Sequence, residues 1–330
     1  MHNTLFKKLS LILISLVFSL IIVELLLRIL GFNPWKYVSS QNQKIFDYDQ
    51  KIGWKSKQGV YDVIASDEFK IKTILTILDD KSRYTGNNFS DKKILIVGGS
   101  FTQGWGVNDN ETFAYKLQNE FTNFKIKNYG QSGYSGVQSY LLLKELLDSE
   151  NKIKLVIYGF IGHHEYRNVA RGEWLELLLK YSKSGHSNSP KIPYATVDKN
   201  KDLILHEPSG YLQLPFREEL SLIPLVERTI MKYSTKRRKK IQKEVARQIF
   251  LKMNNLSKQN NSQFIVLNLH SNIKEYESFF KKNDINFVDC NLFLNENYLI
   301  KGDYHPNGKA HSVYGECINS YINSKNLLLF

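Results

Sequence analysis

Hydrophobic and polar positions follow different patterns in different parts of this chain of 330 residues. Near the N-terminus an uninterrupted run of apolar or small residues covers positions 9–23, and the apolar character continues past Glu24 and Arg28 to residue 30. The whole stretch is 22 residues long, and about 20 apolar residues in a helix suffice to cross a bilayer. The pattern therefore predicts a transmembrane helix over residues 9–30.

The flanks of this stretch indicate how it is used. Lys7 and Lys8 precede it, which favours a cytoplasmic N-terminus and export of the remaining chain to the periplasmic or extracellular face. A cleaved signal peptide has an apolar core of about 7–15 residues and then small residues at the cleavage site, whereas residues 31–35 read GFNPW. We therefore expect an uncleaved signal anchor over residues 1–31. Glu24 and Arg28 are four residues apart and are placed to pair near the membrane edge.

A second pattern begins at residue 92. Short continuous apolar runs, typical of buried parallel strands, alternate with longer segments of helical periodicity. The expected strands cover residues 94–97, 126–128, 154–160, 264–269 and 286–289, and the expected helices cover residues 111–121, 135–147, 236–259, 273–282 and 307–324. Ser135 is expected to cap the second helix. This alternation predicts an α/β fold whose parallel sheet is covered on both faces.

Two segments do not follow the alternation. Residues 32–91 are rich in aromatic and turn-forming residues and read as a connector, in which residues 61–77 partly alternate and predict a small β-ribbon. Residues 163–230 are irregular, with Gly, Ser and Pro at positions 184–193. We expect them to form an insertion within a domain that covers residues 92–330.

Chemically useful residues follow the predicted strands, at the edge where parallel sheets bind ligands. Ser100 follows the first strand, Gly133 lies in the glycine-containing segment after the second, and His163 follows the third. Asp303 and His305 lie on the loop after the fifth strand. We therefore expect these four regions to meet at one rim of the sheet.

Together these residue types are suited to nucleophilic catalysis. A serine hydroxyl is a weak nucleophile unless a base takes its proton, and a histidine oriented by a carboxylate is the usual base. Asp303 and His305 supply both groups on one loop. Acyl transfer also needs donors for the oxyanion, and the backbone N–H groups of Ser100 and Gly133 are candidates.

Three blocks around these residues resemble the signatures of SGNH (GDSL-like) hydrolases. They are residues 98–107 (GGSFTQGWGV), 128–135 (NYGQSGYS) and 302–307 (GDYHPN), in the order of that family. The resemblance covers roughly residues 92–324. It implies a three-layer α/β/α, flavodoxin-like fold with a mainly parallel five-stranded sheet. It also implies ester hydrolysis or acyl transfer without a cofactor or metal, with Ser100 as nucleophile, His305 as base oriented by Asp303, and Gly133 as an oxyanion donor.

The chain departs from the family pattern at three places. Gly99 stands where the signature has aspartate, and the spacing from Asp303 to His305 is one residue shorter than in the commonest Asp-x-x-His form. After the third strand the family has Gly-x-Asn-Asp, but residues 159–165 read GFIGHHE. His163 therefore stands in place of the oxyanion asparagine, and an imidazole N–H can donate a hydrogen bond. Asn168 is the alternative donor.

The pair at residues 163–164 also invites a metal interpretation, with Glu165 or His270 as a third ligand. Adjacent residues direct their side chains differently, so we expect His163 to face the site without a metal.

The net charge limits the classes of binding partner, and the cysteine content leaves the redox state open. The net charge is +13, and eight Lys and Arg residues fall within positions 228–243. A solvated helix face is the simpler interpretation, and contact with anionic headgroups or an anionic substrate is the alternative. A nucleic-acid partner conflicts with the anchor. Cys290 and Cys317 are the two cysteines, and the sequence leaves open whether they form a disulfide or stay buried thiols.

These observations predict a serine esterase that acts on an acyl ester, either of a small molecule or as an O-acetyl group on a cell-surface polysaccharide. An O-acyltransferase is the alternative, because both reactions pass through an acyl-serine. A catalytically weak or inactive carbohydrate-binding or assembly protein is the second alternative, since the asparagine is absent and the spacing of Asp303 and His305 is short. The sequence does not predict an oligomeric state.

Overall fold

The computed structural model describes residues 2–38, 45–66, 68–182 and 190–328. The chain divides into two compact units. The smaller unit combines residues 1–39, 172–190 and 210–236, and the larger unit combines residues 40–171, 191–209 and 237–330. The segments expected as connector and insertion, residues 32–91 and 163–230, are therefore each divided between the two units.

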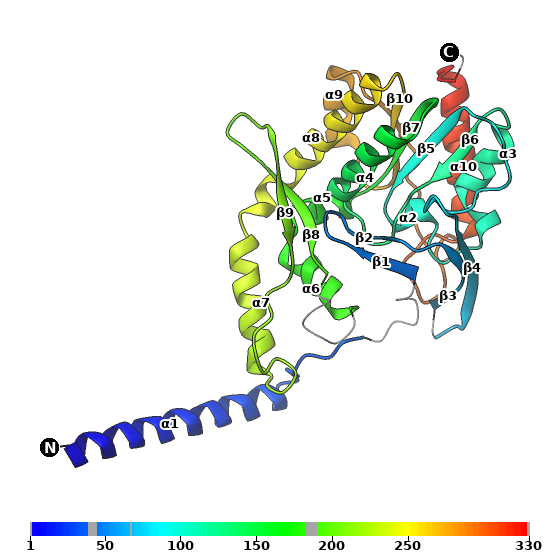
Figure 1. The fold of residues 1–330 in the computed structure, drawn as a ribbon. Helices are drawn as coiled ribbons and strands as arrows, with labels where there is room; N and C mark the ends of the chain where they lie inside the picture. Colours follow the sequence, from blue (N-terminus) through cyan, green and yellow to red (C-terminus); the bar gives the residue numbers. More distant parts are fainter. Residues whose placement is uncertain (1, 39–44, 67, 183–189, 329–330) are drawn as a thin grey trace. The chain divides into compact units, whose positions relative to one another are not determined.

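A five-stranded parallel sheet forms the centre of the larger unit (Figure 1). Its strands are β5 (Lys93–Gly98), β6 (Lys125–Asn128), β7 (Ile153–Ile161), β10 (Gln263–His270) and β11 (Asn286–Asp289). They lie in the order β11-β10-β7-β5-β6, and every neighbouring pair is parallel. Numbered within the sheet this order is 2-1-3-4-5, the flavodoxin-like order. The predicted α/β fold is confirmed.

Helices cover both faces of this sheet because its strands carry apolar side chains on both sides. Leu95 and Val97 of β5 face α4 (Gly136–Ser149), α8 (Arg238–Gln259) and α9 (Lys274–Lys282). Ile94 and Ile96 of the same strand face α3 (Phe113–Glu120) and α10 (Gly308–Ser324). The alternation along one strand therefore specifies the three layers.

Side-chain caps set several helix starts. Ser135 accepts a hydrogen bond from the Gln138 N–H at the start of α4, which confirms the predicted cap. Helix α3 starts two residues later than predicted, because residues Asp109–Glu111 form a 3-10 turn and Thr112 then caps the helix by accepting from Tyr115 N.

Three antiparallel hairpins complete the larger unit. They are β1 (Phe46–Asp49) with β2 (Gly53–Ser56), β3 (Gly59–Ser66) with β4 (Ile71–Ile77), and β8 (Ile192–Val197) with β9 (Leu203–Ser209). The β3–β4 hairpin lies where the sequence predicts a ribbon. The cysteines form a disulfide, Cys290–Cys317, which joins the end of β11 to α10.

The smaller unit contains α1 (His2–Ile29), α6 (Gly172–Lys180) and α7 (Leu222–Thr235). Residues 5–29 of α1 are long and apolar enough to cross a membrane. Around Trp35, a buried ion pair joins Arg217 to Glu227 at 3.0 Å, and the guanidinium lies 4.0 Å from the centre of the indole ring. This arrangement gives both buried charges a partner.

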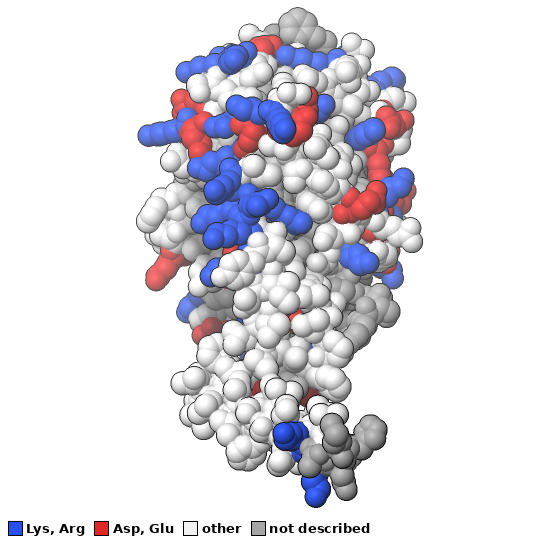
Figure 2. Space-filling view, turned by 90° about the vertical axis from the view of Figure 1, so that its left-hand side faces the viewer, with Lys and Arg blue, Asp and Glu red and all other residues white. Residues whose placement is uncertain are grey.

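The segment with eight Lys and Arg residues, residues 228–243, begins in α7 and continues into the first turns of α8. Arg237, Lys239, Lys240 and Lys243 are exposed there, whereas Arg238 lies over the Tyr194 ring and donates to the carbonyls of residues 169 and 170. Figure 2 shows Lys and Arg side chains gathered on one part of the face that it displays.

Candidate active site

Ser100 lies on a tight turn between β5 and the four-residue helix α2 (Ser100–Gln103). The turn needs glycine at residue 98, where φ is 156° and a Cβ would lie 2.2 Å from Thr102 Oγ1 and 2.7 Å from Gly159 O. Gly104, with φ of 81°, ends the helix by donating its N–H to Ser100 O. The nucleophile candidate therefore follows a buried strand directly and is only 5% exposed.

Gly99 leaves space that a buried histidine occupies. A Cβ on residue 99 would lie 2.7 Å from His164 Nε2, so any larger residue there would clash. The His164 ring is fully buried, and its Nδ1 shares a hydrogen bond of 2.7 Å with the Tyr158 hydroxyl. Burial, followed by the charges of Arg167 and His163, lowers the pKa of His164 well below its usual value. A neutral imidazole therefore fills the space next to Gly99, the residue at which the SGNH signature has an aspartate.

A buried arginine that the sequence analysis did not single out supports the same turn. Arg83 is 1% exposed and donates to the carbonyl oxygens of Gln103 at 2.9 Å, Gly104 at 2.5 Å and Val107 at 2.7 Å. Its Nε also pairs with Asp109 at 2.9 Å. One guanidinium thus satisfies several carbonyls where α2 ends, and it fixes the backbone that follows Ser100.

The structure brings Ser100, His305 and Asp303 together as a hydrogen-bonded chain. Ser100 Oγ lies 2.9 Å from His305 Nε2, and His305 Nδ1 lies 2.6 Å from Asp303 Oδ1. The same carboxylate oxygen also accepts from the His305 backbone N–H at 3.0 Å. The shortened spacing in the sequence therefore still allows Asp303 to orient the ring. An aspartate acceptor at Nδ1 leaves Nε2 free to accept the serine proton.

The surroundings of Asp303 keep its carboxyl group ionised, as the hydrogen bond to the His305 ring requires. Burial alone would raise the pKa of Asp303, but hydrogen bonds from the His305 ring and backbone, the imidazole charge and the Tyr304 N–H together hold it below its usual value. The carboxylate is therefore ionised at neutral pH. Phe101 contacts the His305 ring edge-on, with centroids 5.7 Å apart, and restricts the ring further.

The loop that carries Asp303 and His305 is fastened at several points. The Ile300 N–H donates to His305 O, and the Asn307 N–H donates to Tyr298 O, each at 2.9 Å. Asn307 also caps α10 by accepting from the backbone N–H groups of residues 309 and 310. The Cys290–Cys317 bond encloses this whole segment. The base is therefore held by local contacts and by a covalent link.

Gly133 lies in the loop after β6, which is tied to the Ser100 turn. The Gln131 N–H donates to Gly98 O at 3.0 Å, and both the N–H and the hydroxyl of Ser132 donate to Gln103 Oε1. Gly133 itself has a φ of 81°. Within the described part of the chain, the backbone N–H groups of Ser100 and Gly133 have no hydrogen-bond acceptor. Both groups are therefore available to a ligand.

His163 and His164 start α5 (His163–Asn168) and point in different directions, as expected. His163 is exposed, while its neighbour is buried. Partial removal from water, followed by the charges of Arg167, His270 and His305, lowers the pKa of His163 to about 4. His163 is therefore neutral at pH 7 and can donate one N–H. His163 follows the carboxyl end of β7, which pairs with β5, so it lies at the same edge of the sheet as the Ser100 turn.

The other polar residues of this segment are held by the protein. Asn168 is 1% exposed, and its Oδ1 accepts from the Val137 N–H at 3.1 Å in the first turn of α4. Glu165 accepts from the Tyr276 hydroxyl at 2.7 Å. Among the described residues, no group of three or more His, Cys, Asp and Glu side chains is arranged to hold a metal ion. Of the two candidates for the missing asparagine, His163 is the better placed, and its oxyanion role stays a prediction.

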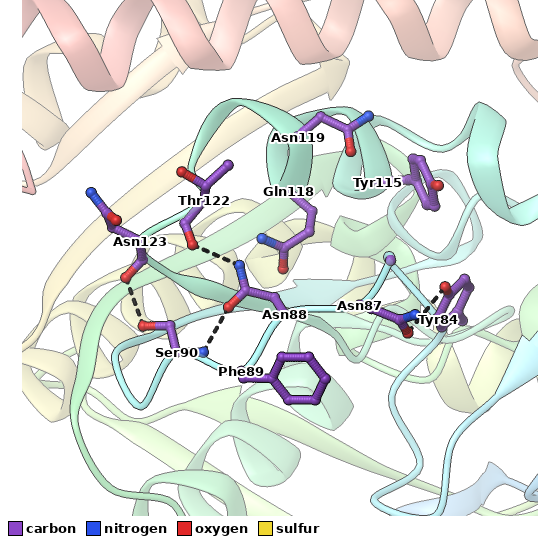
Figure 3. A pocket seen from close by; sticks show the side chains of 11 residues that line it. Tyr84, Asn87, Asn88, Phe89, Ser90, Tyr115, Gln118, Asn119, Thr122 and Asn123 are labelled. Atoms are coloured by element: carbon purple, nitrogen blue, oxygen red, sulfur yellow. Dashed lines mark hydrogen bonds between the residues drawn. The ribbon is translucent and has the colours of Figure 1, made fainter.

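A surface cavity of about 760 Å³ lies away from these residues (Figure 3). Its lining consists of amide, hydroxyl and aromatic residues and one glycine, namely Tyr84, Gly86, Asn87, Asn88, Phe89, Ser90, Tyr115, Gln118, Asn119, Thr122 and Asn123. Asn88 and Ser90 are bound to backbone carbonyls of Thr122 and Asn123. Its lining contains no charged side chain and none of the three hydrogen-bonded residues above. This cavity therefore lacks groups for acid–base chemistry.

Comparisons with known proteins found solved structures that are similar to this chain at low sequence identity. No family model matches the chain, and no curated protein is similar to it. Among solved structures, it is similar to a lipolytic protein of the G-D-S-L family from Veillonella parvula, at 10% identity and a TM-score of 0.40 over 70% of this chain and 98% of that one. It is also similar to TesA, at 13% identity and a TM-score of 0.42 over 72% and 100% of the chains.

A third similar structure is AlinE4, described as an SGNH-hydrolase family esterase. It has 14% identity and a TM-score of 0.36 over 74% of this chain and 95% of that one. Because these similarities are low, a catalytic function for this chain depends on its own geometry at Ser100, His305 and Asp303.

Proposed function

We propose that this protein is a serine hydrolase of acyl esters, of the SGNH type. One observation carries the proposal, namely the continuous chain from Ser100 Oγ through His305 to Asp303, with distances of 2.9 and 2.6 Å. A serine, an imidazole and an ionised carboxylate in this order are the components of nucleophilic acyl transfer. The backbone N–H groups of Ser100 and Gly133, which have no acceptor among the described residues, would donate to the oxyanion that forms during this reaction.

The reaction follows from these positions. Ser100 Oγ attacks the ester carbonyl carbon while its proton moves to His305 Nε2. The carbonyl oxygen takes up the negative charge next to the N–H groups of Ser100 and Gly133, with His163 as a third donor. Collapse breaks the ester C–O bond, and the imidazolium returns its proton to the leaving alcohol. Water then attacks the acyl-serine by the same route in reverse, with Asp303 stabilising the imidazolium in both halves.

The acyl group and its alcohol are proposed on general grounds. An exported, anchored domain with a basic surface would meet cell-surface polymers, so we propose an O-acetyl ester on a polysaccharide as substrate. Transfer of the same acyl group to a sugar hydroxyl would use the same residues. Release of free acetate compared with formation of an acetylated acceptor separates the two reactions.

We further propose that α1 remains attached as a membrane anchor, with the larger unit on the exported side. Its length and composition support a membrane span. Two charged residues near its end are used in the fold, since Arg28 donates to Glu24 at 2.7 Å and to Glu219 O at 2.7 Å. The Cys290–Cys317 disulfide supports an oxidising compartment for the larger unit.

A labelled fluorophosphonate probe tests the catalytic proposal on the full chain in detergent. Wild type, Ser100→Ala and Ser149→Ala are compared, the last as a control at an exposed serine of α4. We expect labelling and p-nitrophenyl acetate hydrolysis in wild type and the control, and loss of both in Ser100→Ala. A folded wild type that is neither labelled nor active would contradict the proposal and favour a binding role.

A further inference from the structure

Helix α7 has an apolar face that points away from the protein. Its buried residues are Pro224, Glu227, Met231 and Thr235, so the side that packs inward is partly polar. Val226, Ile230 and Tyr233 are 36, 45 and 70% exposed. Spacings of four and three residues place these three side chains on one face of the helix. This face, which we call the α7 stripe, would normally be turned inward.

Basic residues run beside the α7 stripe. Arg228 and Lys232 are exposed on α7, and the exposed Lys236 directly follows its last residue, so a basic residue recurs every four residues beside the stripe. Of these, Arg228 also pairs with Glu176 at 2.7 Å. An apolar face bordered by Lys and Arg is the pattern of helices that lie in the membrane interface. The apolar part enters the boundary between headgroups and acyl chains, and the cations meet anionic headgroups.

Exposed apolar side chains are concentrated in this unit more widely. Within residues 172–182 and 210–236, seven large apolar or aromatic side chains are exposed. Besides the α7 stripe these are Leu177, Tyr181, Phe216 and Leu220. Phe216 and Leu220 lie in the turn that leads into α7, and Phe216 is 66% exposed. Such a density is unusual for a surface that faces only water.

The start of α7 is bound to the end of the predicted transmembrane helix. The Glu24 carboxylate accepts the N–H groups of Ser221 at 2.8 Å and Leu222 at 3.1 Å. These N–H groups belong to the first turn of α7, where no intrahelical acceptor exists and a negative charge also favours the helix dipole. Arg28 completes the contact by donating to Glu219 O.

The position of Glu24 indicates the level at which α7 starts. The apolar segment ends at Ile29, five residues or about 8 Å farther along the helix, so Glu24 lies near the edge of the bilayer. Figure 1 shows that α7 starts beside the end of α1 and runs in a different direction. If α1 crosses the bilayer, α7 is therefore free to extend along its surface.

We propose that α7 is an interfacial membrane helix whose stripe of Val226, Ile230 and Tyr233 inserts into the same bilayer that α1 spans. The proposal rests on the membrane anchoring proposed above and adds a second contact of the same unit with lipid. Charge complementarity and continuity with α1 are the reasons for a lipid occupant. A second copy of the chain or another protein on the stripe are the competing outcomes of the test.

Spin labels on the full chain in nanodiscs test this proposal. Single substitutions Val226→Cys, Ile230→Cys and Tyr233→Cys label the stripe, and Arg228→Cys and Lys232→Cys are matched controls on the same helix. The native cysteines do not compete, because they are joined in a disulfide. Oxygen concentrates in lipid and a nickel chelate stays in water, so relaxation by each reagent reports the surroundings. The nanodiscs contain phosphatidylcholine and phosphatidylglycerol.

We expect the three stripe labels to be accessible to oxygen and shielded from nickel, and the two control labels to show the reverse. Stripe labels that nickel reaches freely would overturn the proposal. Labels shielded from both reagents would also overturn it and indicate a protein occupant. A label at Leu16→Cys reports α1 separately, and p-nitrophenyl acetate hydrolysis reports Ser100. A Leu16 label that oxygen reaches, together with stripe labels that nickel reaches, would contradict only the interfacial position of α7. A Leu16 label that nickel reaches would contradict the membrane anchor as well.

Discussion

The carboxyl ends of β5 and β7 are neighbours in the sheet, where Gly98 pairs with Gly159, but they contribute to the rim in different ways. The end of β5 presents one short turn, and the buried Arg83 holds the backbone around it. The end of β7 presents two adjacent histidines, one exposed and one fully buried. The nucleophile therefore depends on a fixed backbone, whereas the neighbouring strand contributes through two side chains, an exposed His163 and a buried His164 that lies against the Ser100 turn at Gly99.

The largest expected effect concerns the partners of the β5 turn. Asp303→Asn keeps the shape of the side chain but favours the wrong tautomer of His305, so kcat should fall by about 10,000-fold. Steady-state hydrolysis of p-nitrophenyl acetate measures this, and circular dichroism checks that the fold is intact. Activity within tenfold of wild type would show that the hydrogen bond at Nδ1 has no catalytic role.

The end of β7 should contribute less. If His163 donates to the oxyanion, His163→Ala should lower kcat by about 100- to 1,000-fold with little change in KM. His163→Asn restores an N–H donor and should recover much of this loss. Asn168→Ala, whose wild-type side chain binds the Val137 N–H, should lower stability more than kcat. The opposite outcome would assign the oxyanion role to Asn168.

The third prediction concerns the disulfide, which encloses the segment that carries Asp303 and His305. It closes a sequence separation of 27 residues, and loop-closure entropy for that length corresponds to about 3.5 kcal/mol of stability. The variant with Cys290→Ser and Cys317→Ser should unfold at a lower temperature by a corresponding amount in a detergent melt. Fluorophosphonate labelling should also weaken, because the segment with His305 is less restrained. An unchanged melting temperature would contradict this.

The contact between the two strand ends is testable by a double-mutant cycle. Gly99→Ala places a Cβ 2.7 Å from His164 Nε2, and such overpacking costs about 1–3 kcal/mol. In a His164→Ala background the same change should be nearly neutral, which gives a coupling energy of about 1–3 kcal/mol. Additive effects on thermal unfolding would show that the ring moves aside freely.

The smallest expected effect is a pH dependence from the β7 end. The folded-state pKa of His163, about 4, lies below the usual value near 6.5. The unfolded chain therefore binds more protons between these values, and His163 should make stability fall as the pH drops from about 6.5 to about 4. His163→Asn should unfold with a shallower pH dependence than wild type when melting temperatures at pH 7 and pH 4.5 are compared. Equal slopes would indicate that the exposed ring titrates normally.

The sequence predicted the five-stranded sheet well, because apolar runs report buried strands directly. The boundaries of β11 match the expected residues 286–289, and Ser100, Asp303 and His305 lie within hydrogen-bond distance in series. The pairing of Glu24 with Arg28 also follows from their spacing on one helix and is confirmed.

Long-range contacts were beyond the reach of the sequence. Arg83 binds carbonyls of residues 103–107, and no local pattern marks an arginine whose acceptors are backbone atoms. The smaller unit joins three separate segments, so residues 32–91 and 163–230 each read as irregular on their own. Even the departure at Gly99 has a physical reason only when the distant His164 ring is placed beside it.

The contact between Gly99 and His164 limits the order in which this site can change. An aspartate at residue 99 would meet the buried imidazole, so a single substitution toward the common signature passes through a crowded and destabilised protein. Loss of the His164 ring first would leave a buried void and an unpartnered Tyr158 hydroxyl. Each residue thus makes the other difficult to replace. Only a simultaneous change of residues 99 and 164 avoids an intermediate protein of lower stability.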